Sequence, residues 1–105
     1  MTIKELIQTA VLQAQEKGFH SPSPTALEKL ALITSEVGEA VEELRIDRVP
    51  YYIDAGKPCG LVSELADIVI RVADMCGYYG YDLEKAIEDK LRYNKTRPYK
   101  HGKKI

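Results

Sequence analysis

Apolar residues recur at helical spacing along most of this chain, and the pattern predicts four helices. Capping-box patterns mark where the first two begin, at Thr2 with Glu5 and at Thr25 with Glu28. The predicted helices cover residues 3–17, 25–48, 61–76 and a last segment from Asp82 to just before Pro98.

The second predicted helix carries an apolar stripe that we expect to face the core. Its members are Leu27, Leu30, Ile33, Val37, Val41 and Leu44. Residues 49–60 then form a connection that is longer than most helix–helix loops, which suggests a binding loop or lid. Tyr51 and Tyr52 would either cover a ligand there or pack the loop onto the body. We find no strand-like alternation, so the chain is predicted to be a compact all-α, four-helix bundle.

The third predicted helix is apolar around most of its circumference. Its polar residues, Ser63, Glu64, Asp67, Arg71 and Asp74, fall in one stripe roughly 100° wide. Such a helix is normally buried, and burying carboxylates is costly unless cations or hydrogen-bond donors compensate them. The pattern therefore raises the question of what neutralises Glu64 and Asp67.

Composition narrows the class of protein. Acidic and basic residues nearly balance, with a formal net charge of −1, which argues against nucleic-acid binding through bulk charge. There is no signal peptide and no apolar run near the roughly 20 residues of a membrane span. Cys59 and Cys76 have no metal or redox spacing, as in reduced cytosolic proteins. We expect a single cytoplasmic domain, residues 1–105, with a basic tail at about 98–105 and no membrane partner.

Two acidic pairs stand out: Glu36 with Glu39, and Glu64 with Asp67. Residues three apart on a helix lie on nearly the same face, so packing the second helix beside the third would bring four carboxylates together. Hard oxygen ligands of this kind suit Mg²⁺, with Mn²⁺ as the alternative ion. A di-iron centre would require Glu-x-x-His motifs, which neither His20 nor His101 provides.

Each acidic pair also has a simpler interpretation. Taken alone, Glu36 and Glu39 are more typical of a solvated helix face. Glu64 and Asp67 could belong to an internal ion pair with Arg71, although one arginine cannot balance these two carboxylates and Asp74 together. The metal hypothesis is therefore favoured for the second pair, and it strengthens the case for the first.

The last predicted helix carries Lys90, Asn94 and Arg97 on one face. Cations and an amide donor beside a metal–carboxylate cluster are what a polyphosphate requires. The alternative is that these residues form the solvent-facing edge of a terminal helix. The phosphate site is favoured over this alternative only because the acidic pairs are present.

The two acidic motifs and the segment from Lys90 to Gly102 resemble the MazG-like nucleotide pyrophosphohydrolases of the all-α NTP pyrophosphatase superfamily. That group shows E-x-x-E, a variable spacer and then E-x-x-D. The resemblance spans about residues 26–104. It implies Mg²⁺-dependent hydrolysis of a nucleoside triphosphate to the monophosphate and pyrophosphate by a metal-activated water.

The resemblance also assigns roles and an assembly. Glu36, Glu39, Glu64 and Asp67 would hold the metal, and Lys90, Asn94 and Arg97 would bind phosphates in a homodimer or homotetramer. Some members carry an extra glutamate, a candidate base, where this chain has Ser35, so the general base stays open.

The sequence leaves alternatives for the residues that contact the base, for the substrate and for the class of protein. Phe19, His20, Tyr51 and Tyr52 could contact a base, although packing is the commoner role of aromatic residues; His20 is our candidate. The substrate could instead be a related metabolite such as phosphoribosyl-ATP. The chain could also be a non-catalytic helical binding or assembly module whose acidic stripe pairs with arginines across an interface.

Overall fold

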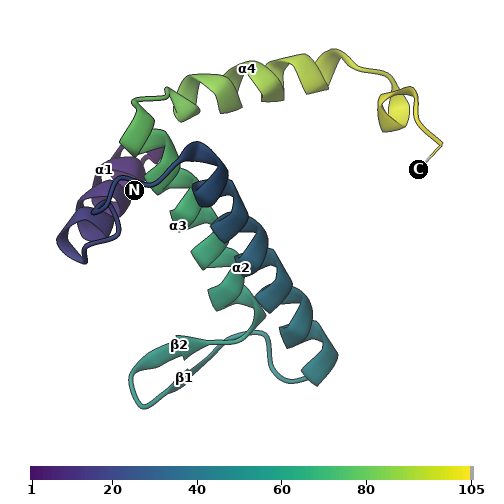
Figure 1. The fold of residues 1–105 in the computed structure, drawn as a ribbon. Coiled ribbons are helices and arrows are strands. Elements are labelled where there is room, and N and C mark those ends of the chain that lie inside the picture. The colour runs from purple at the N-terminus through teal and green to yellow at the C-terminus, as the bar shows by residue number, and fades with distance from the viewer. Residues whose placement is uncertain (105) are drawn as a thin grey trace.

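The computed structural model describes residues 1–104, and the chain is mostly helical, as the periodicity predicts (Figure 1). One short hairpin interrupts the helices. The elements in chain order are α1 (Ile3–Glu16), α2 (Ala26–Ile46), β1 (Tyr52–Asp54), β2 (Lys57–Cys59), α3 (Leu61–Tyr79), α4 (Leu83–Thr96) and a 3-10 turn, η1 (Tyr99–Gly102).

Both predicted capping boxes form, which confirms the starts of α1 and α2. The Thr2 hydroxyl accepts the Glu5 N–H at 3.0 Å, and the Thr25 hydroxyl accepts the Glu28 N–H at 3.1 Å. The ends differ slightly from prediction: α2 stops at Asp47, whose φ of 56° is left-handed, whereas α3 continues past Gly77 to Tyr79.

Helix α3 is the centre of the fold, because both α1 and α2 pack against it. Gly77 allows α1 to approach closely: a Cβ atom added there would stand 2.9 Å from Val11 Cβ and 3.0 Å from Ile7 Cγ2. The absence of a side chain at Gly77 thus sets the α1–α3 separation.

Few apolar residues are buried within one copy of the chain. The buried ones are all alanines: Ala10, Ala40 and Ala73. The stripe predicted to face the core is instead half-exposed on α2; its exposed members are Leu27, Leu30, Val37, Val41 and Leu44. The apolar helix α3 likewise exposes Val62, Leu65 and Val69. The prediction that these faces are buried is wrong for the single chain, because no described element covers them.

The connection before α3 contains a two-stranded antiparallel hairpin, with Tyr52 paired to Cys59, so the expectation of no strand was wrong. Ala55 and Gly56 both have positive φ, as a tight two-residue hairpin turn requires. The hairpin base is tied to α3: Val62 donates its N–H to the Pro50 carbonyl at 2.9 Å. A Cβ on Gly60 would lie 2.4 Å from that same carbonyl oxygen.

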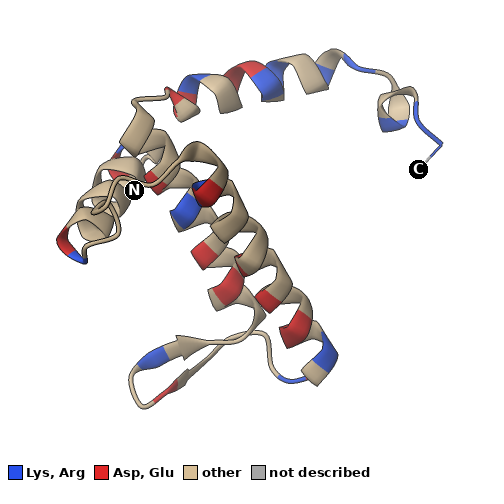
Figure 2. Ribbon diagram, in the orientation of Figure 1, with Lys and Arg blue, Asp and Glu red and all other residues tan. Residues whose placement is uncertain are grey.

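Helix α4 extends away from the other helices instead of packing along them (Figure 1). It has no buried residue, and its main contact is with α1, where Lys4 and Glu84 form an ion pair at 3.8 Å. Figure 2 shows acidic residues gathered on α2 and α3, and basic residues toward the end of α4 and beyond it. Within residues 1–104, no helix combines the length and apolarity needed to cross a membrane.

Replacing Gly77 with alanine tests the close α1–α3 approach. The added methyl must displace Val11, so we expect the free energy of unfolding to fall by about 1–3 kcal/mol, measured by urea denaturation. The matched control is Gly38→Ala in α2, where a Cβ meets nothing within 4 Å; it should be neutral or stabilising by up to about 1 kcal/mol. Equal effects of the two substitutions would contradict this account of the packing.

Candidate metal centre

Three carboxylates from two helices converge between α2 and α3. Glu36 on α2 and Glu64 and Asp67 on α3 each offer an oxygen, and these oxygens all lie within 4.8 Å of one another. The helices run side by side in opposite directions (Figure 1), and the spacing of three places Glu64 and Asp67 on one face of α3. The predicted meeting of the two acidic motifs is therefore present for these three residues.

Two oxygens of this cluster are buried without a partner. Glu36 Oε2 and Glu64 Oε2 are shielded from solvent, and neither has a hydrogen-bond partner among the described residues. Buried carboxylate oxygens are normally paired, because leaving one unpaired costs about 1–3 kcal/mol or more. A cation bound here would find free oxygen ligands.

The electrostatics of the cluster point the same way. Burial raises the pKa of Glu64 above its ordinary value, and the neighbouring Glu39, Asp67 and Glu36 carboxylates raise it further. Burial also raises the pKa of Asp67, with Glu36 adding to the effect while Arg71 and Lys57 oppose it. The site thus holds more negative charge than its surroundings stabilise.

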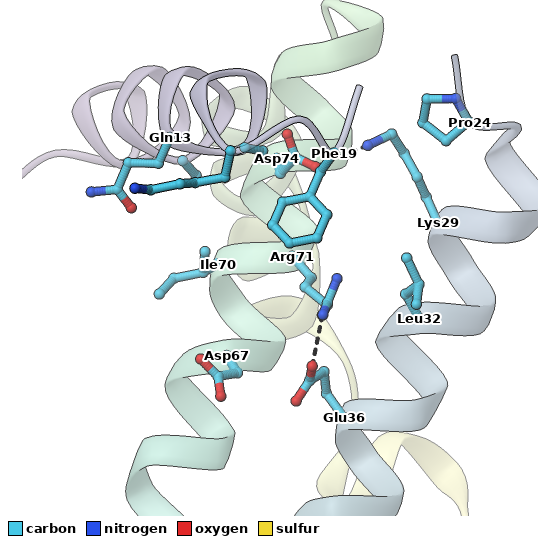
Figure 3. Close-up of a pocket in the computed structure, with 13 residues that line it drawn as sticks. Gln13, Phe19, Pro24, Lys29, Leu32, Glu36, Asp67, Ile70, Arg71 and Asp74 are labelled. Atoms are coloured by element: carbon cyan, nitrogen blue, oxygen red, sulfur yellow. Dashed lines mark hydrogen bonds and ion pairs between the residues drawn. The ribbon is translucent and has the colours of Figure 1, made fainter. Parts of the chain in front are cut away.

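Arg71 neutralises only part of this charge, and its partner lies on the other helix. Its Nε donates to Glu36 Oε1 at 2.8 Å, as the dashed line in Figure 3 shows. Arg71 therefore does not form the ion pair with Glu64 or Asp67, on its own helix, that was the alternative in the sequence analysis. Asp74 has partners of its own: Lys29 Nζ forms an ion pair with it at 2.9 Å, and His20 Nε2 is within hydrogen-bonding distance at 2.8 Å. Glu64 and Asp67 have no ion-pair partner among the described residues.

One predicted metal ligand lies outside the cluster, and one residue near the cluster was not predicted. Glu39 is exposed, as Asp67 is, and lies outside the three-carboxylate cluster, although its carboxyl group raises the pKa of Glu64 through a side-chain contact as well as through its charge. Lys57 was not among the predicted site residues. It lies in the hairpin, and its positive charge opposes the rise in the pKa of Asp67. Its only sequence signal was its place in the long connection before α3.

A cavity of about 320 Å³ adjoins the cluster and extends between α1, α2 and α3. Glu36, Asp67 and Arg71 line one part, and Lys29 with Asp74 lines another (Figure 3). The apolar walls come from Phe19, Pro24, Leu32 and Ile70. The cavity is at the small end of ligand sites, which is sufficient for a planar ring system.

The remaining predicted site residues lie apart from the carboxylates. His20 contacts the cavity through Asp74, and its ring packs against Tyr78 with centroids 4.7 Å apart. Lys90 and Asn94 are on α4, which extends away from α2 and α3, and Arg97 follows its last residue. No α4 cation is among the charges that shift the pKa of Glu64 or Asp67. Within one chain, the two halves of the predicted site are therefore separate.

Comparisons with protein-family models, curated proteins and solved structures find no match to this chain. The geometry itself tests whether a hard divalent cation fits. Among three oxygens on one octahedral Mg²⁺, at most one pair can be trans, about 4.2 Å apart, and the other pairs are about 2.9 Å apart. Oxygens that lie within 4.8 Å of one another must therefore move closer together to bind one ion. Oxygen-only ligands and two unpartnered buried oxygens are the chemistry that such an ion requires.

Glu64→Gln separates a metal site from an ordinary ion-pair network. Without metal, removing this charge relieves repulsion, so the thermal midpoint should rise by about 4–8 °C for each kcal/mol relieved. Wild-type protein should be stabilised by added Mg²⁺, and Glu64→Gln should lose most of that response in differential scanning fluorimetry. The control is Glu42→Gln, a charge on the exposed side of α2. A Mg²⁺ response that is unchanged in Glu64→Gln would contradict the assignment.

The same stabilisation should depend on pH. Because folding raises the pKa of Glu64 and Asp67, the folded protein holds extra protons between their ordinary values, 4.5 and 3.8, and the raised ones. Repulsion is therefore absent below this window and complete above it, so these two groups lower metal-free stability as pH rises. Protons and Mg²⁺ compete for the same oxygens, and the Mg²⁺-induced shift in midpoint should shrink as pH falls. A pH-independent shift would contradict this.

Proposed function

We propose that this chain is a Mg²⁺-dependent nucleoside triphosphate pyrophosphohydrolase, which converts (d)NTP to (d)NMP and pyrophosphate. The observation that carries the proposal is the cluster of Glu36, Glu64 and Asp67, with two buried oxygens that lack partners. The spacing of the acidic motifs and the segment after Lys90 support the choice of substrate through their resemblance to MazG-like enzymes. Removal of non-standard or surplus nucleotides is the role we infer.

The proposed chemistry needs little from the protein beyond charge and position. Bound Mg²⁺, or Mn²⁺, would supply Lewis acidity and lower the pKa of an attacking water. Glu36, Glu64 and Asp67 would hold the ion, with Glu39 at the edge. Lys90, Asn94 and Arg97 would stabilise the charge on the phosphates as the bond breaks. No covalent protein intermediate is required.

The nucleoside would occupy the cavity beside the carboxylates. Phe19 is 65% exposed and could stack on a base, while Leu32 and Ile70 provide apolar walls. The Gln13 amide and the Lys29–Asp74 pair are the polar groups available to read base edges. His20 would act by orienting Asp74, a more indirect role than the base contact suggested from the sequence.

A homodimer or homotetramer is part of the proposal. Leu30, Val37, Val41 and Leu44 lie on one stripe of α2 and are between 45% and 66% exposed. Contiguous apolar faces of this kind mark interaction surfaces, and three buried alanines are a small core for a chain of this length. A second copy of the chain would cover them.

Two alternatives to this function correspond to particular features of the structure. The Arg71–Glu36 pair favours the non-catalytic assembly module, because it shows that one carboxylate can be balanced by the protein itself. A related pyrophosphate-containing substrate such as phosphoribosyl-ATP would use the same cluster and differ only in the cavity.

Pyrophosphate release from a panel of NTPs and dNTPs with Mg²⁺ tests the proposal. Asp67→Asn should lower the rate by about 100-fold or more, since a metal ligand acts through several kcal/mol of charge stabilisation. Asp54→Asn, an exposed hairpin position, is the matched control and should keep wild-type activity. Circular dichroism would verify that both variants stay helical. Release from no nucleotide in the panel, or full activity of Asp67→Asn, would overturn the assignment.

A further inference from the structure

Lys29 is a charged residue that the fold buries beside the cavity. Only 6% of its surface is exposed, and it lines the cavity together with Asp74. Its Nζ donates to Asp74 Oδ2 at 2.9 Å, and the ammonium lies over the Tyr78 ring, 4.6 Å from the centroid. Among residues 1–104, Lys29 Nζ has no other hydrogen-bond acceptor. An ammonium group with three N–H donors therefore keeps at least one for a molecule in the cavity.

Lys29 and the carboxylate cluster lie toward opposite ends of the cavity. On α2, Lys29 precedes Glu36 by seven residues. On α3, Asp74 follows Asp67 by seven residues. Seven residues rise about 10 Å along a helix, and Figure 3 shows the two ends in this arrangement. A nucleotide whose phosphates are held at the carboxylates would place its sugar between the two ends and its base beside Lys29.

The surroundings of Lys29 favour a neutral acceptor over an anion. The Asp74 carboxylate lies 2.9 Å from the ammonium, so an anion that approaches Lys29 is also repelled by Asp74. A carbonyl oxygen accepts an N–H and adds no charge. The walls of the cavity are apolar, from Phe19, Leu32 and Ile70. A flat ring that carries a carbonyl group suits both the donor and the walls.

The hydrogen-bonding capacity of this end of the cavity distinguishes between bases. The two Asp74 oxygens already have one partner each, His20 and Lys29, whereas Lys29 has an N–H to spare. A carbonyl on a base can accept that N–H. An amino group at the same place brings two more donors, and a buried donor left unpaired is costly. Gln13 also lines the cavity, but it is exposed and its amide can donate or accept, so it favours neither kind of base.

We propose that Lys29 determines base specificity, by donating to a carbonyl at the edge of the base that points away from the sugar. The preferred nucleotides are then those of 6-oxopurines and 4-oxopyrimidines, and the corresponding 6-amino and 4-amino bases are disfavoured. That the ligand is a nucleotide rests on the proposed function. The role of Lys29 as a donor in the cavity rests on its burial and its contacts, and it can be tested by binding alone.

Two matched pairs of substrates test the inference. ITP and ATP differ in an oxo or amino group at purine C6, and UTP and CTP differ in the same way at pyrimidine C4. In wild-type protein, kcat/KM for pyrophosphate release should favour the oxo member of each pair by about 10-fold or more, because a hydrogen bond from a charged donor contributes a factor of this size. Lys29→Met should bring the two members of each pair within about twofold of each other.

Two further variants control for charge and folding. Lys17→Met removes another lysine that lines the same cavity but is exposed, and it should keep the oxo preference. Lys29→Met leaves Asp74 without its cation, so Lys29→Met/Asp74→Asn removes both charges of the buried pair and should lose the preference in the same way. Circular dichroism would verify that all three variants stay helical.

Binding measured by calorimetry separates this inference from the proposed function. IMP should bind wild-type protein about 10-fold more tightly than AMP, and UMP more tightly than CMP, with both differences lost in the Lys29 variants. If wild-type protein releases no pyrophosphate but binds the oxo members more tightly, the proposed function fails and the role of Lys29 stands. Equal use and binding of both members of each pair, a preference for the amino members, an oxo preference that persists in the folded Lys29 variants, or binding of none of the four monophosphates by an inactive wild-type protein would overturn the inference.

Discussion

Repulsion among carboxylates at the α2–α3 contact is the constraint on which the fold and the site both depend. The two helices pack closely enough to bury oxygens of Glu36 and Glu64, and only one carboxylate of the cluster has an ion-pair partner among the described residues. Arg71 pairs with Glu36, while further along α3 Lys29 pairs with Asp74 and His20 hydrogen-bonds it. The compensation is incomplete at Glu64 and Asp67, where pKa values rise instead. A fold that keeps this imbalance is poised for a cation.

Local signals in the sequence predicted the helices well. Capping boxes at Thr2 and Thr25 are determined by neighbouring residues, so they could be recognised without the fold. The convergence of Glu36 with Glu64 and Asp67 also followed, because helical spacing and one assumption about packing were sufficient. The metal ion and the reaction remain hypotheses.

Features that depend on distant contacts could not be predicted in this way. The strands of the hairpin are three residues long, too short for an alternating pattern, and Ala55 is an unusual residue for its turn. The partners of Asp74 come from residues 45 and 54 positions away. Apolar periodicity located the stripe containing Val37 and Val41 but could not say whether the same chain covers it, because hydrophobicity specifies burial and not the identity of the covering surface.

The anchoring of the hairpin has a mechanical consequence for access to the carboxylates. Because Gly60 abuts the Pro50 carbonyl and Val62 bonds to it, the base of the hairpin and the first turn of α3 form one stiff joint. This joint opposes hinge motion at the base of the connection from 49 to 60. Within the hairpin, Lys57 can still adjust by side-chain rotation, and its charge opposes the rise in the pKa of Asp67. Movement of the whole hairpin would first have to break the Val62–Pro50 hydrogen bond, so it belongs with slow local opening and not with nanosecond rotamer changes.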